Sequence, residues 1–164
     1  IEMTISALSK LKFDDKLKAM GVTPKNVEQF KDKYFISISH STVFENEEVA
    51  DGEWIPTFRE NRRNVLCLLF DDVVDEAFNH IPGTKVFSEE QAVQVVNFLD
   101  TIKPNENTEL IIHCAMGSSR SVAIGEFAAE TFGQRPEFIN ARIDRKANPL
   151  VARKLREAKS QRPF

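Results

Sequence analysis

The sequence is poor in the residues that hold small proteins together through covalent or metal links. Among its 164 residues there are only two cysteines, Cys67 and Cys114, and three histidines. Two cysteines make neither a disulfide framework nor a CxxC metal knuckle. No apolar run approaches the roughly 20 residues that span a bilayer, and no signal-peptide pattern opens the sequence. We therefore expect a protein of a reducing compartment such as the cytoplasm, with no metal, no cofactor and no membrane.

An excess of positive charge is also lacking. Lysine and arginine number 22 against 25 aspartate and glutamate residues, so the formal net charge is −3. Proteins that bind nucleic acid normally carry a basic excess, and a nucleic-acid partner is not expected. Hydrophobic residues make up 41% of the chain, too many for a disordered protein. The length suits one domain over residues 1–164, with no linker dividing it.

The hydrophobic pattern predicts alternating strands and helices. Continuous apolar runs at 65–70 and 110–113 are typical of strands buried on both faces, as in a parallel sheet. The alternation over 35–39 predicts a half-buried strand. Helices are predicted over 9–19, 24–33, 88–102, 119–132 and 149–159. The expected fold is an α/β domain whose central, mostly parallel sheet is flanked by helices.

One joint between a predicted strand and a predicted helix carries a chemical pattern. The strand ends at Cys114, and Arg120 begins the helix six residues later, with Gly117 at the tightest point of the turn. A loop of small residues that leads into a helix N-terminus directs several N–H groups inward, which makes an anion cradle. The Arg120 guanidinium adds a planar fork that matches two phosphate oxygens. The residues expected to bind phosphate are Ala115, Met116, Gly117, Ser118, Ser119 and Arg120.

Cys114 is the expected nucleophile at the base of this cradle. Positive potential from the helix end and from Arg120 favours the thiolate, which is the reactive form of cysteine. The Ser121 hydroxyl can donate to the sulfur when a covalent intermediate breaks down. His113 is expected to orient the loop rather than to act as a base. The chemistry also needs an acid to protonate the departing oxygen.

The segment His113–Ser121, of the form HC-x5-RS, resembles the phosphate-binding loop of the cysteine-based protein phosphatases. Its Gly-x-Ser-Arg-Ser ending is similar to the dual-specificity branch in particular, and the resemblance covers about residues 64–133. It implies a protein-tyrosine-phosphatase-like fold and metal-independent hydrolysis through a phosphocysteine.

The resemblance also implies that the general acid is an aspartate on a loop of about residues 71–87. In members with a Phe-Asp-Asp segment the second aspartate has this role, which here is Asp72, with Asp71 in reserve. Asp72 lies 42 residues before Cys114, a longer interval than in compact dual-specificity members. Asp75 and Glu76 therefore stay in competition.

The expected activity is hydrolysis of phosphotyrosine in proteins, and of phosphoserine and phosphothreonine as well. The uncharged loop residues between Cys114 and Arg120 favour a phosphoprotein or phosphopeptide substrate over a polyphosphoinositide. Two alternatives stay open: a phospho-binding module without turnover, and an RNA 5′-triphosphatase with a similar loop.

Two residues outside the cradle have open roles. Cys67 is expected to pack in the core, with a regulatory disulfide to Cys114 as the alternative. Asn148, which precedes Pro149, is expected to begin the last helix, and a role in bracing the phosphate loop stays open.

Overall fold

The computed structural model of the chain describes residues 3–45, 55–77, 82–138 and 146–161. The strands are β1 (Thr4–Ser9), β2 (Lys33–Ser39), β3 (Val65–Leu69), β4 (Glu109–Cys114) and β5 (Pro136–Phe138). The helices are α1 (Lys10–Met20), the short 3₁₀ helix η1 (Val27–Gln29), α2 (Glu89–Asp100), α3 (Arg120–Phe132) and α4 (Pro149–Ser160). The five strands form one sheet in the order β3-β2-β4-β1-β5, and every pairing in it is parallel. The predicted α/β architecture with a parallel sheet is confirmed.

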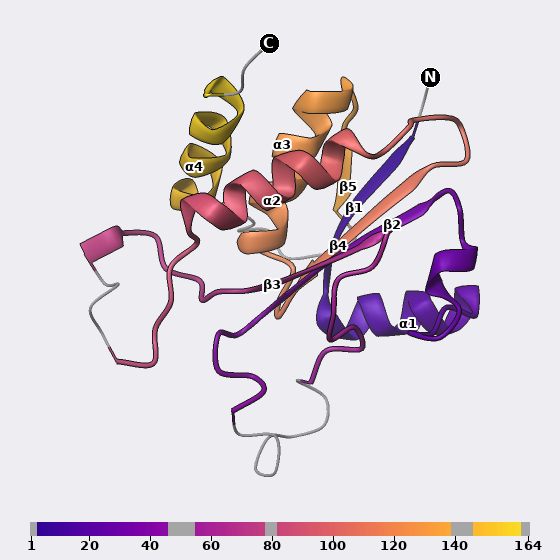
Figure 1. Ribbon diagram of the computed structural model, residues 1–164, viewed down its shortest axis with the longest axis horizontal. Coiled ribbons are helices and arrows are strands. Elements are labelled where there is room, and N and C mark those ends of the chain that lie inside the picture. The colour runs from indigo at the N-terminus through magenta and orange to yellow at the C-terminus, as the bar shows by residue number, and fades with distance from the viewer. Residues whose placement is uncertain (1–2, 46–54, 78–81, 139–145, 162–164) are drawn as a thin grey trace.

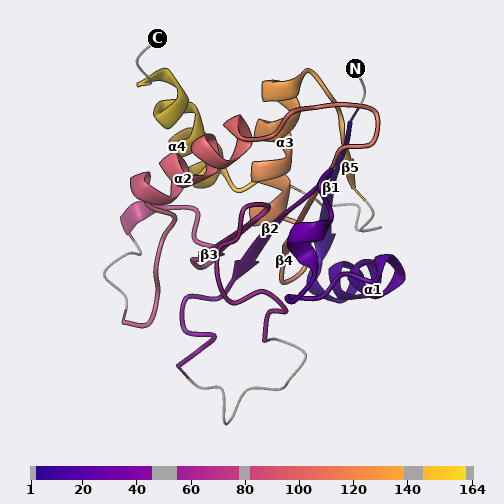
Figure 2. The ribbon, with the colours of Figure 1, turned by 45° about the vertical axis from the view of Figure 1, so that its right-hand side comes forward.

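Helices cover both faces of the sheet. Figure 1 shows α2, α3 and α4 grouped on one side of the strands and α1 on the other, and the turned view of Figure 2 keeps this division. The larger hydrophobic cluster lies under α2, α3 and α4, and a smaller one lies under α1 around Phe13 and Phe35. None of the helices in the described ranges is long and apolar enough to cross a membrane.

Local capping signals account for most of the helix ends. Ser88 and Gln91 form the predicted capping box at the start of α2, with both reciprocal hydrogen bonds present. Asn148 caps α4 by accepting hydrogen bonds from the amides of Leu150 and Val151. Gly133 ends α3 in the left-handed conformation. These helices are therefore predictable from residues next to their ends.

The helix predicted over 24–33 is wrong, because the chain there forms only the three residues of η1 and turns. The amide of Thr23 donates to the Asn26 side chain at 2.7 Å and the amide of Asn26 donates to the Thr23 hydroxyl at 3.3 Å, a reciprocal pair that leads only into turns and η1. The buried side-chain amide of Asn64 donates to three carbonyls of this segment, at 2.9, 3.2 and 2.9 Å. A distant asparagine thus takes the acceptors that helical hydrogen bonds would have used.

Strands β1 and β5 were not predicted, although β1 lies inside the sheet between β4 and β5. Only three apolar residues, Ile5, Ala7 and Leu8, lie within β1, and the pattern they make is short. Strand β2 was predicted to be half-buried but is buried on both faces, because α1 covers the second face and Ser37 is enclosed there. Tertiary neighbours, rather than the local pattern, bury these strands.

A buried polar pair links β2 to β4 under α1. The Ser37 hydroxyl lies 2.6 Å from Nε2 of His113, and the Phe13 ring packs on the imidazole with 4.2 Å between ring centroids. Nδ1 of His113 lies 3.4 Å from the carbonyl oxygen of Cys114. Burial lowers the pKa of His113 from 6.5 to about 4, although the hydrogen bond to Cys114 acts in the opposite direction. His113 is therefore neutral at neutral pH, which agrees with an orienting role.

The neutral His113 makes stability depend on pH. The unfolded chain takes up a proton at this group below about pH 6.5, whereas the folded chain does so only near pH 4. Acid therefore favours the unfolded chain, and His113 should account for a loss of roughly 2–3 kcal/mol of unfolding free energy between pH 7 and pH 4. Urea unfolding of the wild type and of His113→Asn at several pH values measures this. The stability gap between the two proteins should shrink as the pH falls, and a constant gap would contradict the burial of a neutral imidazole.

Candidate active site

The candidate site lies where the carboxyl ends of parallel strands meet at one edge of the sheet. Cys114 ends β4, the middle strand, and the segments that follow β1, β2 and β3 leave the sheet at the same edge. Crevices at this edge are the usual ligand sites of open parallel sheets. The topology therefore brings together residues that lie far apart in the sequence.

The Cys114 thiol is enclosed at the base of the loop between β4 and α3. The residue is 2% exposed, and its Sγ accepts a hydrogen bond from the Gly117 amide at 3.2 Å. The Ser121 hydroxyl lies 3.1 Å from the same sulfur. Both groups are placed to donate a hydrogen bond to the sulfur. The structure brings together the predicted nucleophile and the predicted serine.

The loop turns its carbonyls away from the sulfur. Three of them accept from backbone amides outside the loop, each at 3.2 Å: Ala115 from Lys10, Ser118 from Lys146, and Ser119 from Asn148. Ser119 is the N-cap residue of α3, but its side chain makes no cap hydrogen bond within the described part of the chain. The first N–H groups of α3 are thereby left to a ligand at the helix N-terminus. This arrangement is compatible with the anion cradle, which stays a prediction.

Gly117 is required where the loop crosses β1. Its φ is +70°, in the left-handed region, and a Cβ built on it would clash with the backbone of Ser9 and lie 2.5 Å from the Leu8 carbonyl carbon. Backbone atoms inside a central strand cannot move away cheaply. Only glycine therefore lets the loop lie this close to β1.

Arg120 is anchored at one nitrogen and unpaired at another. The residue is 8% exposed, and Nη1 donates to the Phe70 carbonyl at 2.7 Å. Its Nε is buried and has no hydrogen-bond partner among the described residues. An unpaired buried guanidinium N–H is costly, and an oxyanion in the cradle would satisfy it.

Asp72 lies against the loop, where the acid was expected. Its Oδ1 accepts from the Ser119 hydroxyl at 2.8 Å and from the side-chain amide of Asn148 at 2.8 Å. The residue is exposed, so the carboxyl group is open to a ligand above the loop. The open bracing role of Asn148 is confirmed in part, since its backbone amide also donates to the Ser119 carbonyl.

The Asp71 carboxylate has hydrogen-bond partners different from those of Asp72. It accepts from the Ser41 hydroxyl at 2.6 Å and from the Lys85 amide at 2.7 Å, and His40 lies 3.1 Å away. Partial burial acts to raise the pKa of Asp71, but the hydrogen bonds from Ser41 and Lys85 outweigh it and lower the pKa. A carboxylate held ionised in this way donates a proton less readily, and Asp71 connects the segments of Ser41 and Lys85. The choice between Asp71 and Asp72 as the acid stays a prediction.

The other two competitors for the acid role also lie elsewhere. Asp75 accepts from the amide of Ala77 at 2.9 Å. Glu76 pairs with Lys154 of α4 at 2.7 Å. Lys154 is 3% exposed and also donates to the Phe87 carbonyl at 2.7 Å, so it is a structural cation rather than part of a solvated helix face.

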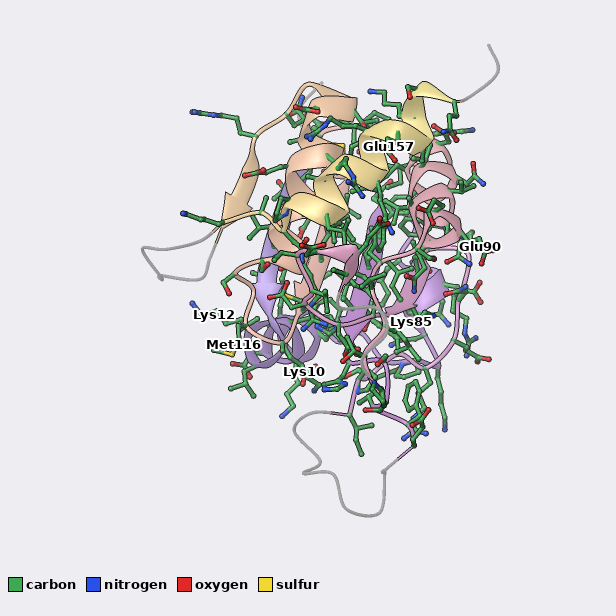
Figure 3. The ribbon with its side chains drawn as sticks, turned by 90° about the vertical axis from the view of Figure 1, so that its left-hand side faces the viewer. Lys10, Lys12, Lys85, Glu90, Met116 and Glu157 are labelled. Atoms are coloured by element: carbon green, nitrogen blue, oxygen red, sulfur yellow. The ribbon has the colours of Figure 1, made fainter. Side chains whose placement is uncertain are left out.

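A cavity of about 150 Å³ opens beside the cradle. It is lined by Lys10, Ile38, Ser39, His40, Val43, His113, Ala115 and Arg120. The walls of the cavity are mostly apolar. Because Arg120 is one of its lining residues, the cavity adjoins the cradle. Figure 3 shows Met116 on the outer side of the loop, near Lys10 and Lys12 at the start of α1. A flat apolar group attached to a bound phosphate would fit in this cavity.

Cys67 is separate from the site. The register places Cys67, Ser37 and His113 in one row across β3, β2 and β4, so Cys67 and Cys114 lie about 10 Å apart, two strand spacings and one residue. Disulfides need Cα atoms within roughly 7 Å, and the alternative of a disulfide is excluded in this fold. Burial, together with the charge of Glu60, raises the pKa of Cys67 to about 11, so its thiol stays protonated. It packs half-buried against the smaller core, largely as expected.

Sequence reasoning missed two contacts at the site. The Lys10 amide holds the Ala115 carbonyl, and the Ser119 hydroxyl reaches Asp72. No local sequence pattern predicts either contact, because each contact joins segments that are distant in the sequence. Among the described residues, no group of three or more histidine, cysteine and acidic side chains is placed to hold a metal ion.

Comparisons of the chain with family models, curated proteins and solved structures found no match. A function for this site is therefore argued from its geometry and chemistry.

The close contact at Gly117 predicts an effect on anion binding. Gly117→Ala should abolish the rise in melting temperature that inorganic phosphate produces in the wild type, because the loop can no longer lie against β1. Gly133→Ala is the matched control: its φ is +64°, but nothing lies within 4 Å of a Cβ there. The control should lose about 1–2 kcal/mol of stability and still bind phosphate. Phosphate binding by Gly117→Ala at the wild-type level would contradict the cradle.

Proposed function

We propose that this chain is a cysteine-dependent phosphoprotein phosphatase, similar to the dual-specificity branch of the protein tyrosine phosphatases, with a fold of that type. One observation carries the proposal: the buried Cys114 sulfur lies under an open cradle, with Arg120 beside it and Asp72 hydrogen-bonded to the cradle's rim. Nucleophile, anion site and acid are the three parts that phosphoryl transfer through cysteine needs.

The first step forms a phosphocysteine. The Cys114 thiolate attacks phosphorus, the S–P bond forms, and the bond from phosphorus to the ester oxygen breaks. Asp72 gives its proton to that oxygen, which leaves as a phenol or an alcohol. Arg120 and the loop amides hold the other three oxygens as their charge shifts. The unpaired Nε of Arg120 supports this role, because a bound phosphate would supply its missing acceptor.

The second step releases phosphate. Asp72, now ionised, takes a proton from water while the water oxygen attacks phosphorus, and the S–P bond breaks. The departing sulfur regains its negative charge, and the Ser121 hydroxyl, 3.1 Å away, stabilises it. Arg120 and the amides supply the positive charge that other phosphatases take from metal ions. A reducing compartment such as the cytoplasm suits this chemistry, since oxidation would consume the thiolate.

The neighbouring cavity supports phosphotyrosine as the preferred substrate. Its mostly apolar walls, which include Ile38, Val43 and Ala115, suit a phenyl ring attached to the phosphate. The side chains of phosphoserine and phosphothreonine carry no ring to fill this space. The uncharged loop residues support a phosphoprotein rather than a lipid with several phosphates.

Replacing the nucleophile tests the proposal. Cys114→Ser should reduce hydrolysis of a phosphotyrosine peptide by more than about 1,000-fold, because a serine hydroxyl is not ionised in this cradle. Binding of vanadate or of the intact peptide should remain, and the wild type should hydrolyse a matched phosphoserine peptide more slowly. Cys67→Ala is the control and should keep full activity. Turnover by Cys114→Ser would end the proposal, and a wild type that binds without turnover would favour a phospho-binding module.

The two aspartates of the Phe-Asp-Asp segment give separate expectations. Asp72→Asn should lower kcat on the phosphotyrosine peptide by about 100-fold or more, because no proton reaches the leaving phenol. Asp71→Asn should mainly lower stability, since its carboxylate accepts hydrogen bonds from Ser41 and Lys85, which lie outside the phosphate loop. Steady-state kinetics and melting curves of both variants measure this. The opposite pattern would assign the acid to Asp71.

A further inference from the structure

Asn148 contacts three separate parts of the candidate site although it lies 34 residues after Cys114. Asn148 is 1% exposed and is the N-cap residue of α4. The side-chain amide donates to Oδ1 of Asp72 at 2.8 Å and to the Val73 carbonyl at 3.2 Å. Its backbone amide donates to the Ser119 carbonyl at 3.2 Å. One residue thus joins the acid segment, the phosphate loop and α4.

The orientation of this side chain is determined by its contacts. Oδ1 of Asn148 accepts from the amides of Leu150 and Val151, at 3.0 and 3.2 Å. Both protons of the amide nitrogen are used on the other side, by Asp72 and Val73. A flipped amide would set its nitrogen against two N–H donors, so only one orientation satisfies every group. The donor that faces Asp72 is therefore held by the helix cap itself.

These contacts also define which oxygen of Asp72 transfers the proton. Oδ1 faces two donors, the Asn148 amide and the Ser119 hydroxyl. An oxygen that accepts from both is disfavoured as the carrier of the acidic proton. Oδ2 is the remaining oxygen, and it is the one available to a leaving group above the loop.

The acid segment has a second attachment to the same helix. Lys154, six residues after Asn148 and within α4, donates to Glu76 at 2.7 Å and to the Phe87 carbonyl at 2.7 Å. Helix α4 therefore anchors the segment after β3 at its beginning, through Asp72, and again near its end, through Phe87. Ser119 and Asn148 hold Asp72 of this segment against the phosphate loop.

We propose that Asn148 is a positioning residue, which holds Asp72 over the phosphate loop before the substrate binds, with Oδ2 directed at the leaving oxygen. The inference rests on the proposed function, since it assigns Asn148 a part in the same reaction. Helix capping by Asn148 needs only its side-chain oxygen, whereas positioning of Asp72 needs its side-chain amide. The amide N–H groups are the part that acts on Asp72.

Two variants separate the two roles. Asn148→Ser keeps an N-cap oxygen but lacks the amide donor, whereas Asn148→Ala lacks both. Each is compared with the wild type on phenyl phosphate, whose leaving group needs a proton, and on 2,4-dinitrophenyl phosphate, whose leaving group departs as a stable anion. Melting temperatures are measured in parallel, and Asn148→Ala should melt lower than Asn148→Ser.

Both variants should lose about 10- to 100-fold in kcat/KM on phenyl phosphate and less than about threefold in kcat/KM on the dinitrophenyl ester. The ratio kcat/KM reports formation of the phosphocysteine, whereas kcat also includes its hydrolysis, in which Asp72 is the base for both esters. KM should change little, because the cradle remains. In the Asp72→Asn background, Asn148→Ser should cause no further loss on phenyl phosphate, because the residue it positions is no longer an acid. The same kinetic loss in two variants of different stability would establish a role beyond capping.

The contrary results are distinct. Equal losses in kcat/KM on both esters, or a further loss in the Asp72→Asn background, would mean that Asn148 acts on the phosphate loop, and either would overturn the inference. Full activity of Asn148→Ser on phenyl phosphate would overturn it as well. Failure of the proposed function would appear separately, as hydrolysis of both esters by Cys114→Ser.

Discussion

The contact between Gly117 and the backbone of Leu8 and Ser9 is the constraint on which the site depends. It allows the loop after β4 to lie directly on the end of β1, where the first amide of α1 takes the Ala115 carbonyl. With its carbonyls held on the outside, the loop presents N–H groups to the inside, and one of them meets the Cys114 sulfur. A side chain as small as a methyl group at this position would separate the loop from the strand.

A second layer of contacts connects the loop to the rest of the fold through buried polar groups. His113 stays neutral because burial lowers its pKa to about 4, so it adds no positive charge behind the sulfur and serves to join β4 to Ser37. Arg120 bonds to the Phe70 carbonyl, which ties the cradle to the residue before Asp71 and Asp72. Arg120 and the segment that carries Asp71 and Asp72 are thereby coupled in position. Helix α4 completes this arrangement through Asn148.

Much of the fold could be predicted where a local pattern and a tertiary environment agree. The apolar run before Phe70, the capping box at Ser88 and the loop ending at Arg120 each led to an element that the structure contains. The segment 24–33 shows the opposite case, since Asn64 takes its carbonyls from a distance and no helix forms. Strand β1 was missed because parallel pairing to β4 and β5, rather than its own short pattern, makes it a strand.

By itself, the sequence determined the chemistry that the chain can carry: a cysteine, a glycine, an arginine and a serine spaced so that one strand-to-helix turn can gather them. Helical caps and apolar runs are local, so they too can be read from neighbouring residues. Only the tertiary structure shows the different surroundings of Asp71 and Asp72, because their partners, Ser41 for one and Asn148 for the other, come from distant parts of the chain. The same holds for the separation of Cys67 from Cys114, which follows from strand order and register. The residue types specify which hydrogen bonds and reactions are available, and the fold specifies which side chains come close enough to make them.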